Sequence, residues 1–240
     1  MPNSEHIVTS YEDELIELAR SISEMGGLVE KAISNATDAL IRSDADLAMA
    51  TVAADKKVDA MQAHIDEMAV SIIARRQPMA QDLRLVIASI HVANDLERIG
   101  DMAKSTARRS TQFEGIGMSS QFKNGLRHMG ELVQRQVKLA LDAFAGRDKD
   151  IAIDVVERDT DVDALYVSLF RELLTYMMED PRNITASTHM LFIAKNIERI
   201  GDHATNIAET IYYRIKGEDL PMDTRPKNDA ANFAVVEPNE

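Results

Sequence analysis

The chain has 240 residues, and 27 lysines and arginines against 40 aspartates and glutamates give it a net charge of −13. Hydrophobic residues make up 45% of the chain, enough to bury a core, which argues against wholesale disorder. The acidic balance argues against nucleic-acid binding, which depends on clustered Lys and Arg. The absence of cysteine excludes a disulfide framework and a thiolate metal site.

Neither a secretory leader nor a membrane-spanning segment is recognisable in the sequence. Residues 1–18 lack a basic stretch followed by an apolar one. The most apolar run, residues 83–94, is too short and too polar to span a bilayer. We therefore expect a cytoplasmic protein that associates with the membrane only through partners.

Apolar residues recur at alternating spacings of three and four, which predicts long amphipathic helices and an all-α fold. Six helices are predicted, at residues 8–42, 45–76, 79–112, 119–145, 148–179 and 182–216. Asp44 is placed to cap the second helix and Pro78 to open the third. Asp180 followed by Pro181 gives the same kind of start signal for the sixth helix.

The chain contains an internal repeat. The segment DLERIGD at residues 95–101 recurs as NIERIGD at residues 196–202, and residues 55–61 recur in similar form at residues 159–165. The period covers three helices, which predicts two tandem, pseudo-symmetric three-helix bundles. The predicted divisions are a first repeat at 8–112, a second repeat at 118–216 and a flexible C-terminal tail at 217–240.

Carboxylates at i,i+4 spacing interrupt the predicted buried faces of the helices. On the third helix, the apolar seam runs on at the same spacing into polar groups: Leu83, Ile87, Ile90, Asn94, Glu97 and Asp101. Similar interruptions occur on the other helices of the repeat. Four acidic pairs, two in each unit, are thus predicted to point toward the interior: Asp55 and Asp59, Glu97 and Asp101, Asp159 and Asp163, and Glu198 and Asp202.

These carboxylates repel one another, by about 0.2–0.5 kcal/mol per pair even when exposed, and burial without a partner costs several kcal/mol more. Pairing with a neighbouring Lys or Arg, or simple exposure to solvent, would explain a single pair. A solvated face gives no reason to repeat the arrangement on facing helices of both units, so we favour a cation held between helices. Oxygen ligands suit Mg²⁺, Mn²⁺ or iron, and zinc is possible but disfavoured without cysteine.

Other residues extend or limit this hypothesis. His203 could add a nitrogen ligand beside Asp202, although Met102 holds the equivalent position in the first unit. The alternative function is a metal-dependent hydrolase or oxidase, since clustered carboxylates support metal-activated water. No Glu is followed by His three residues later, which weakens the oxidase. Gly100 and Gly201, both in mid-helix, suggest a close helix approach or space beside the acidic groups.

The repeated ERIGD segments, each with an acidic pair on the preceding helix, together with the segment PMAQDLR at residues 78–84, resemble the PhoU family of bacteria. The resemblance covers most of residues 8–216. It implies a non-enzymatic regulator of phosphate homeostasis, which represses the phosphate-starvation response and modulates phosphate uptake. The implied partners are the ATPase subunit of the phosphate ABC transporter, a phosphate-responsive sensor histidine kinase and a second copy of the chain in a homodimer.

By position, the resemblance also implies that the eight carboxylates of the four pairs are metal ligands. The residues next to these carboxylates differ between the two units. The second unit has Lys195 and Asn196 at the positions where the first unit has Asn94 and Asp95. The two metal sites therefore need not be equivalent in charge or occupancy.

Overall fold

The computed structural model describes residues 3–113 and 120–221 of the chain, and every regular element in these ranges is helical. The elements are α1 (Asn3–Arg42), α2 (Ala45–Ala54), α3 (Lys56–Arg76), α4 (Ala80–Ser110), η1 (Thr111–Phe113), α5 (Ser120–Gly146), α6 (Lys149–Glu157), α7 (Asp159–Glu179), η2 (Pro181–Asn183) and α8 (Ile184–Lys216). The predicted all-α fold class is confirmed.

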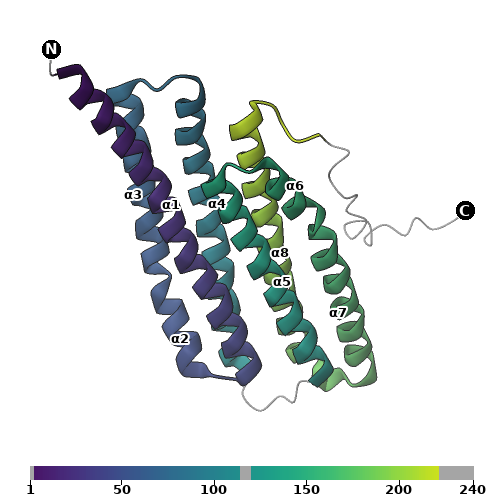
Figure 1. Ribbon diagram of the computed structural model, residues 1–240. Helices are drawn as coiled ribbons and strands as arrows, with labels where there is room; N and C mark the ends of the chain where they lie inside the picture. The colour runs from purple at the N-terminus through teal and green to yellow at the C-terminus, as the bar shows by residue number, and fades with distance from the viewer. Residues whose placement is uncertain (1–2, 114–119, 222–240) are drawn as a thin grey trace, which may run out of the picture.

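The helices form two three-rod units side by side (Figure 1). One unit contains α1, the α2–α3 rod and α4, and the other contains α5, the α6–α7 rod and α8. The units join mainly where α4 packs against α8 and α1 packs against α5. Each middle rod, predicted as one continuous helix, is interrupted at a single residue, Asp55 in the first unit and Arg158 in the second.

Side-chain caps fix where several helices begin. The Asp44 carboxylate accepts a hydrogen bond from the Leu47 backbone N–H at 2.9 Å, which satisfies one of the free amides at the start of α2. Asp180 accepts from the Arg182 backbone N–H at 2.9 Å, and Pro181 opens the short 3₁₀ turn before α8. The predicted caps at Asp44 and Asp180 are confirmed, whereas α4 begins at Ala80, two residues after Pro78.

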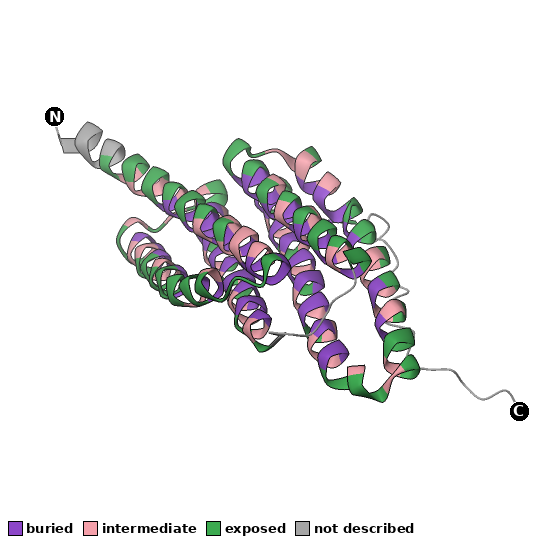
Figure 2. Ribbon diagram, turned by 90° about the horizontal axis from the view of Figure 1, so that it is seen from below, coloured by how far each residue is buried: buried purple, intermediate pink, exposed green. Residues whose placement is uncertain are grey.

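The core is a continuous apolar interior shared by both units (Figure 2). The predicted stripe on α1 is fully buried at Leu18, Ile22, Met25 and Val29. Burying side chains of this size stabilises the fold by about 1.5–3 kcal/mol each. The apolar interior therefore holds the rods together and fixes which faces of α4 and α8 are left for polar groups.

The predicted seam on α4 is wrong in its phase. Leu83 and Ile87 are 38% and 37% exposed, and Asn94 is also exposed. The buried side chains of α4 lie one or two positions away, at Leu85, Val86, Val92, Ala93, Leu96 and Ile99. Because α4 is covered by α1, α3 and α8, its buried surface is broad, and the predicted seam runs along the edge of that surface.

Parts of two predictions fall outside the described residues. The predicted loop between the units lies almost wholly in 114–119, and most of the predicted tail lies in 222–240. Within the described part, Gly217 ends α8 with a φ of 76°, and Leu220 is buried against the bundle. None of the described helices is both long and apolar enough to cross a lipid bilayer.

Candidate functional site

The second unit places its four predicted carboxylates between α7 and α8. Asp159 is the first residue of α7 and is 8% exposed, and Glu198 on α8 is 5% exposed. Asp163 and Asp202 are half-buried. The structure thus brings acidic groups from two helices to one partly buried region, as the sequence predicted; we call Asp159, Asp163, Glu198 and Asp202 the second acidic cluster.

Burial and mutual repulsion raise the pKa values of three of these groups. Burial raises the pKa of Asp159 to about 7, and the charges of Asp163 and Asp202 add to the effect. Burial and the charge of Asp202 raise the pKa of Asp163. Burial also raises the pKa of Glu198, although its contact with Lys195 opposes the rise. The cluster is therefore short of positive charge.

Hydrogen bonding leaves several oxygens of this region without a partner. Lys195 Nζ contacts Glu198 Oε1 at 2.5 Å, and Gln136 Nε2 of α5 donates to Asp159 Oδ1 at 3.4 Å. Within the described part of the chain, the buried atoms Asp163 Oδ1, Glu198 Oε2 and Gln136 Oε1 have no hydrogen-bond partner. Buried polar atoms are rarely left unsatisfied, and oxygen atoms of this type are the ligands that hard cations prefer. The donor set of the second acidic cluster fits such a cation.

The side chains do not already form a coordination shell. Among residues 3–113 and 120–221, no three His, Asp or Glu side chains are grouped closely enough to hold a metal ion. Binding a cation would require the carboxylates to turn toward a common point. Lys195 already holds Glu198 Oε1, and Gln136 holds Asp159 Oδ1, whereas Glu198 Oε2 is without a partner in the described residues.

The first unit has the same carboxylates, Asp55, Asp59, Glu97 and Asp101, but supplies its own cation. Lys104 Nζ of α4 lies 2.5 Å from Asp55 Oδ2 and 3.1 Å from Asp101 Oδ1, and both carboxylates raise the pKa of the lysine. Asp55 is 5% exposed, so this ammonium neutralises a buried charge. Burial, followed by the charge of Asp101, raises the pKa of Glu97. We call this group the first acidic cluster.

The prediction that all four pairs point inward is wrong for Asp59, which is exposed. The buried stripe of α3 is centred on Val58 and Ala69, and successive helix residues are turned by about 100°. Asp55 lies close to this stripe, whereas Asp59 lies at its far rim. A spacing of four residues places two side chains on the same side of a helix, but it does not ensure that both are buried.

The internal repeat shows which positions differ between the two clusters. Lys104 corresponds to Thr205 in the second unit, and Lys195 corresponds to Asn94 in the first. Thr205 Oγ1 is itself buried without a hydrogen-bond partner in the described residues. A lysine therefore bridges two carboxylates in the first cluster, and in the second a lysine contacts Glu198 alone.

Sequence reasoning missed Gln136 and Lys104 as members of these sites. Gln136 interrupts the apolar stripe of α5 between Val133 and Ala140, where the first unit has Ala32, so this difference between repeats was an available signal. His203, considered as a ligand, instead places Nδ1 2.8 Å from Asp95 Oδ1 and links α8 to α4. The suggested nitrogen ligand is thus engaged elsewhere.

Gly100 and Gly201 stand where the last helix of each unit approaches the acidic cluster. A Cβ atom on Gly201 would lie 2.9 Å from Asp159 Oδ1 and 3.2 Å from Gln136 Oε1. A Cβ atom on Gly100 would lie 3.2 Å from Val58 Cγ1 and 3.5 Å from Asp55 Oδ1. The predicted close approach beside the acidic groups is present in both units and is tighter in the second.

The fold and the site define a class of protein: a duplicated three-helix-bundle protein with an acidic cluster between the middle and last rods of each unit. The family model described as the PhoU domain matches residues 22–110 and 126–211, one match in each unit. The chain belongs to the PhoU family.

Individual relatives match nearly the whole chain. The phosphate-specific transport system accessory protein PhoU homolog of Rhizobium meliloti (strain 1021) is 52% identical over 224 residues, 93% of this chain and 94% of that protein. The homolog of Caulobacter vibrioides (strain NA1000 / CB15N) is 46% identical over 226 residues, 94% and 98% of the two chains. The crystal structure of PhoU from Pseudomonas aeruginosa matches with a TM-score of 0.83 at 45% identity, covering 87% of this chain and 100% of that one.

The raised pKa of Asp159 predicts how stability depends on pH. The pKa of this carboxyl is near 3.8 in the unfolded chain and about 7 in the fold. Because ionisation is less favourable in the fold, the free energy of unfolding decreases as pH rises through that range. We expect Asp159→Asn to stabilise the metal-free protein by about 1–2 kcal/mol at pH 8 and to leave it little changed at pH 4. Urea unfolding at both pH values measures this, and a loss of stability at pH 8 would contradict it.

The close approach at Gly201 predicts a cost for the smallest side chain. We expect Gly201→Ala to destabilise the protein by about 1–3 kcal/mol, because the methyl group displaces Asp159 or Gln136. The matched control is Gly27→Ala on α1, where no atom lies within 4 Å of the added Cβ and higher helix propensity should stabilise by about 1 kcal/mol. Equal stabilisation by both substitutions in urea unfolding would show that the approach at Gly201 is not constraining.

Proposed function

We propose that this chain is a non-enzymatic accessory protein of phosphate-specific transport, which limits phosphate uptake and represses the phosphate-starvation response. The observation that carries this proposal is the 52% identity to an accessory protein of that name over 94% of its length. Two further observations support it: each PhoU-domain match lies within one three-helix unit, and the solved PhoU structures share the fold.

In this proposal the protein works in the cytoplasm as an adaptor between the ATPase subunit of the phosphate ABC transporter and a phosphate-responsive sensor histidine kinase. Long rods suit such a role, because each unit presents an extended outer face. Several large apolar side chains are exposed on the surface of the molecule, among them Met79, Val70, Met178 and Phe192. Two copies of the chain are proposed to associate as a homodimer.

We also propose that the second acidic cluster is the stronger of two cation sites, with Mg²⁺, Mn²⁺ or iron as the ion. Three buried oxygens there have no hydrogen-bond partner in the described residues, whereas Lys104 already neutralises the first cluster. Asp159, Asp163, Glu198 and Asp202 would hold the ion, and Gln136 supplies a further oxygen. When bound, the ion would remove the repulsion among these groups and cross-link α7 to α8.

The lysine difference predicts a gain of metal binding. We expect Lys104→Thr, which copies Thr205, to add about one bound Mn²⁺ per chain, because Asp55 and Asp101 lose their ammonium partner. Without metal the same variant should be destabilised by about 3 kcal/mol, since a buried carboxylate is left unpaired. Elemental analysis after dialysis against Mn²⁺ measures the stoichiometry.

The exposed Lys31→Thr is the control for this change and should alter neither quantity. A stoichiometry in Lys104→Thr equal to that of the unmodified chain would contradict the assigned role of the lysine. Asp163→Asn tests the second cluster in the same assay. That variant should lose metal-induced thermal stabilisation while remaining folded without metal.

The adaptor role predicts direct association. The purified chain should retain the transporter ATPase and the sensor kinase in pull-downs, and deletion of its gene should derepress phosphate-starvation genes at high phosphate. Failure to retain either partner at any phosphate concentration, together with unchanged repression after deletion of the gene, would exclude the adaptor. Turnover by metal-loaded protein that disappears in Asp163→Asn would instead indicate the metal-dependent hydrolase or oxidase.

A further inference from the structure

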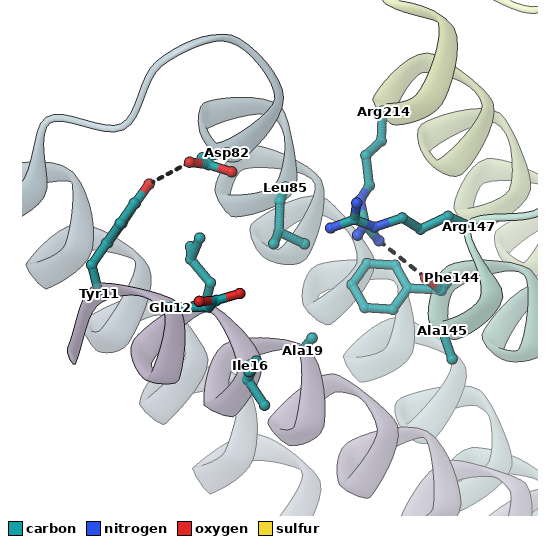
Figure 3. A pocket seen from close by; sticks show the side chains of 11 residues that line it. Tyr11, Glu12, Ile16, Ala19, Asp82, Leu85, Phe144, Ala145, Arg147 and Arg214 are labelled. Carbon is teal, nitrogen blue, oxygen red and sulfur yellow. Dashed lines mark hydrogen bonds between the residues drawn. The ribbon is translucent and has the colours of Figure 1, made fainter. Parts of the chain in front are cut away.

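A cavity of about 430 Å³ opens at one end of the bundle, where both units contribute to its wall (Figure 3). The first unit supplies Tyr11 and Glu12 of α1 and Asp82 of α4. The second unit supplies Arg147, which follows α5, and Arg214 of α8. Arg214 is twelve residues beyond Asp202 on the same helix, or about 18 Å along its axis, so the cavity is separate from the second acidic cluster.

Arg214 is held in the wall of this cavity at 8% exposure. Its guanidinium carbon lies 4.7 Å from the centre of the Phe144 ring, and Nη1 donates to the Phe144 carbonyl oxygen at 3.1 Å. Burial, together with the neighbouring charge of Arg147, lowers the pKa of Arg214 to about 10. Packing therefore fixes the position of a buried cation at an energetic cost.

The two arginines lie head to head, and neither has a carboxylate partner within the described residues (Figure 3). The carboxyl-terminal ends of α5 and α8 offset part of their repulsion, because helix C-termini favour cations. The arginine pair is not a feature shared by both repeats, because Ser43 occupies the position in the first unit that is equivalent to Arg147. In a chain of net charge −13, these two guanidiniums make one wall of the cavity positively charged.

We propose that this cavity binds a phosphoryl oxyanion, free or as a phosphate monoester, between Arg147 and Arg214. The planar guanidinium group matches the oxygen pairs of a phosphoryl group through two parallel hydrogen bonds. The cavity is larger than inorganic phosphate requires and lies in the size range of small-molecule sites.

The acidic wall of the cavity gives a second element of recognition. Glu12 and Asp82 line the side formed by the first unit, and Asp82 Oδ2 already accepts a hydrogen bond from the Tyr11 hydroxyl at 3.0 Å. A hydrogen phosphate carries a proton that the Glu12 carboxylate can accept, whereas sulfate at neutral pH carries none. We therefore expect the site to prefer phosphate to sulfate.

Calorimetric titration of the full, metal-free chain with inorganic phosphate at constant ionic strength tests the proposal. We expect saturable binding, weakened about tenfold or more in Arg147→Asn. Asn suits this position because Arg147 has a φ of 51°, which Asn tolerates. Arg127→Gln, an exposed change on α5, is the control and should bind within about twofold of the unmodified chain.

Absence of saturable binding, or equal binding by Arg147→Asn and the unmodified chain, would overturn the proposal. Equal affinity for sulfate would overturn the identification of the ligand as a phosphoryl group. Glycerol 3-phosphate distinguishes the two sources: tighter binding than inorganic phosphate identifies a monoester, and weaker binding identifies the free ion. Because no partner protein or metal is present, the result is independent of the adaptor and cation proposals.

Discussion

The structure depends on how buried carboxylates are neutralised between the middle and last rods of each unit. Asp55 and Asp159 stand at the breaks that divide the two middle rods, and both are almost fully buried. Apolar packing of the rods holds them there, and burial, followed by repulsion from Asp163 and Asp202, raises the pKa of Asp159 to about 7. The stability of each unit therefore depends on which group carries the compensating positive charge.

The two units neutralise their buried carboxylates in different ways. In the first, Lys104 bridges two carboxylates, so the charge is balanced by the chain itself. In the second, Lys195 pairs with one carboxylate, that of Glu198, and buried oxygens are left without partners in the described residues. The first cluster is thus neutralised within the chain, whereas the second leaves buried carboxylate oxygens unpaired among the described residues.

Charge is also distributed along the rods. The acidic clusters lie in the central parts of α4 and α8, and the Arg147–Arg214 pair lies at the end where α1, α4, α5 and α8 meet. Helix α8 carries both Glu198 and Arg214, so ligands at the two sites would act on one continuous element. The mid-helix Gly201 lets this helix approach the carboxylates closely.

The sequence by itself determined the all-α class, the six rods, the caps at Asp44 and Asp180, and the acidic residues of each repeat, because helical periodicity and internal repetition are local properties of the chain. Only the tertiary structure decided which of those carboxylates are buried. The seam through Leu83 and Ile87 was placed in the wrong phase, because a helix packed on three neighbours buries a broad surface whose centre a single stripe does not reveal. The hydrogen-bond and ion-pair partners of the carboxylates could not be predicted from the sequence either. Gln136 contacts Asp159 and Lys104 contacts Asp55 because the rods that carry them pack side by side in the tertiary structure. Arg147 and Arg214 are far apart in the sequence, so no sequence pattern indicated that they lie together.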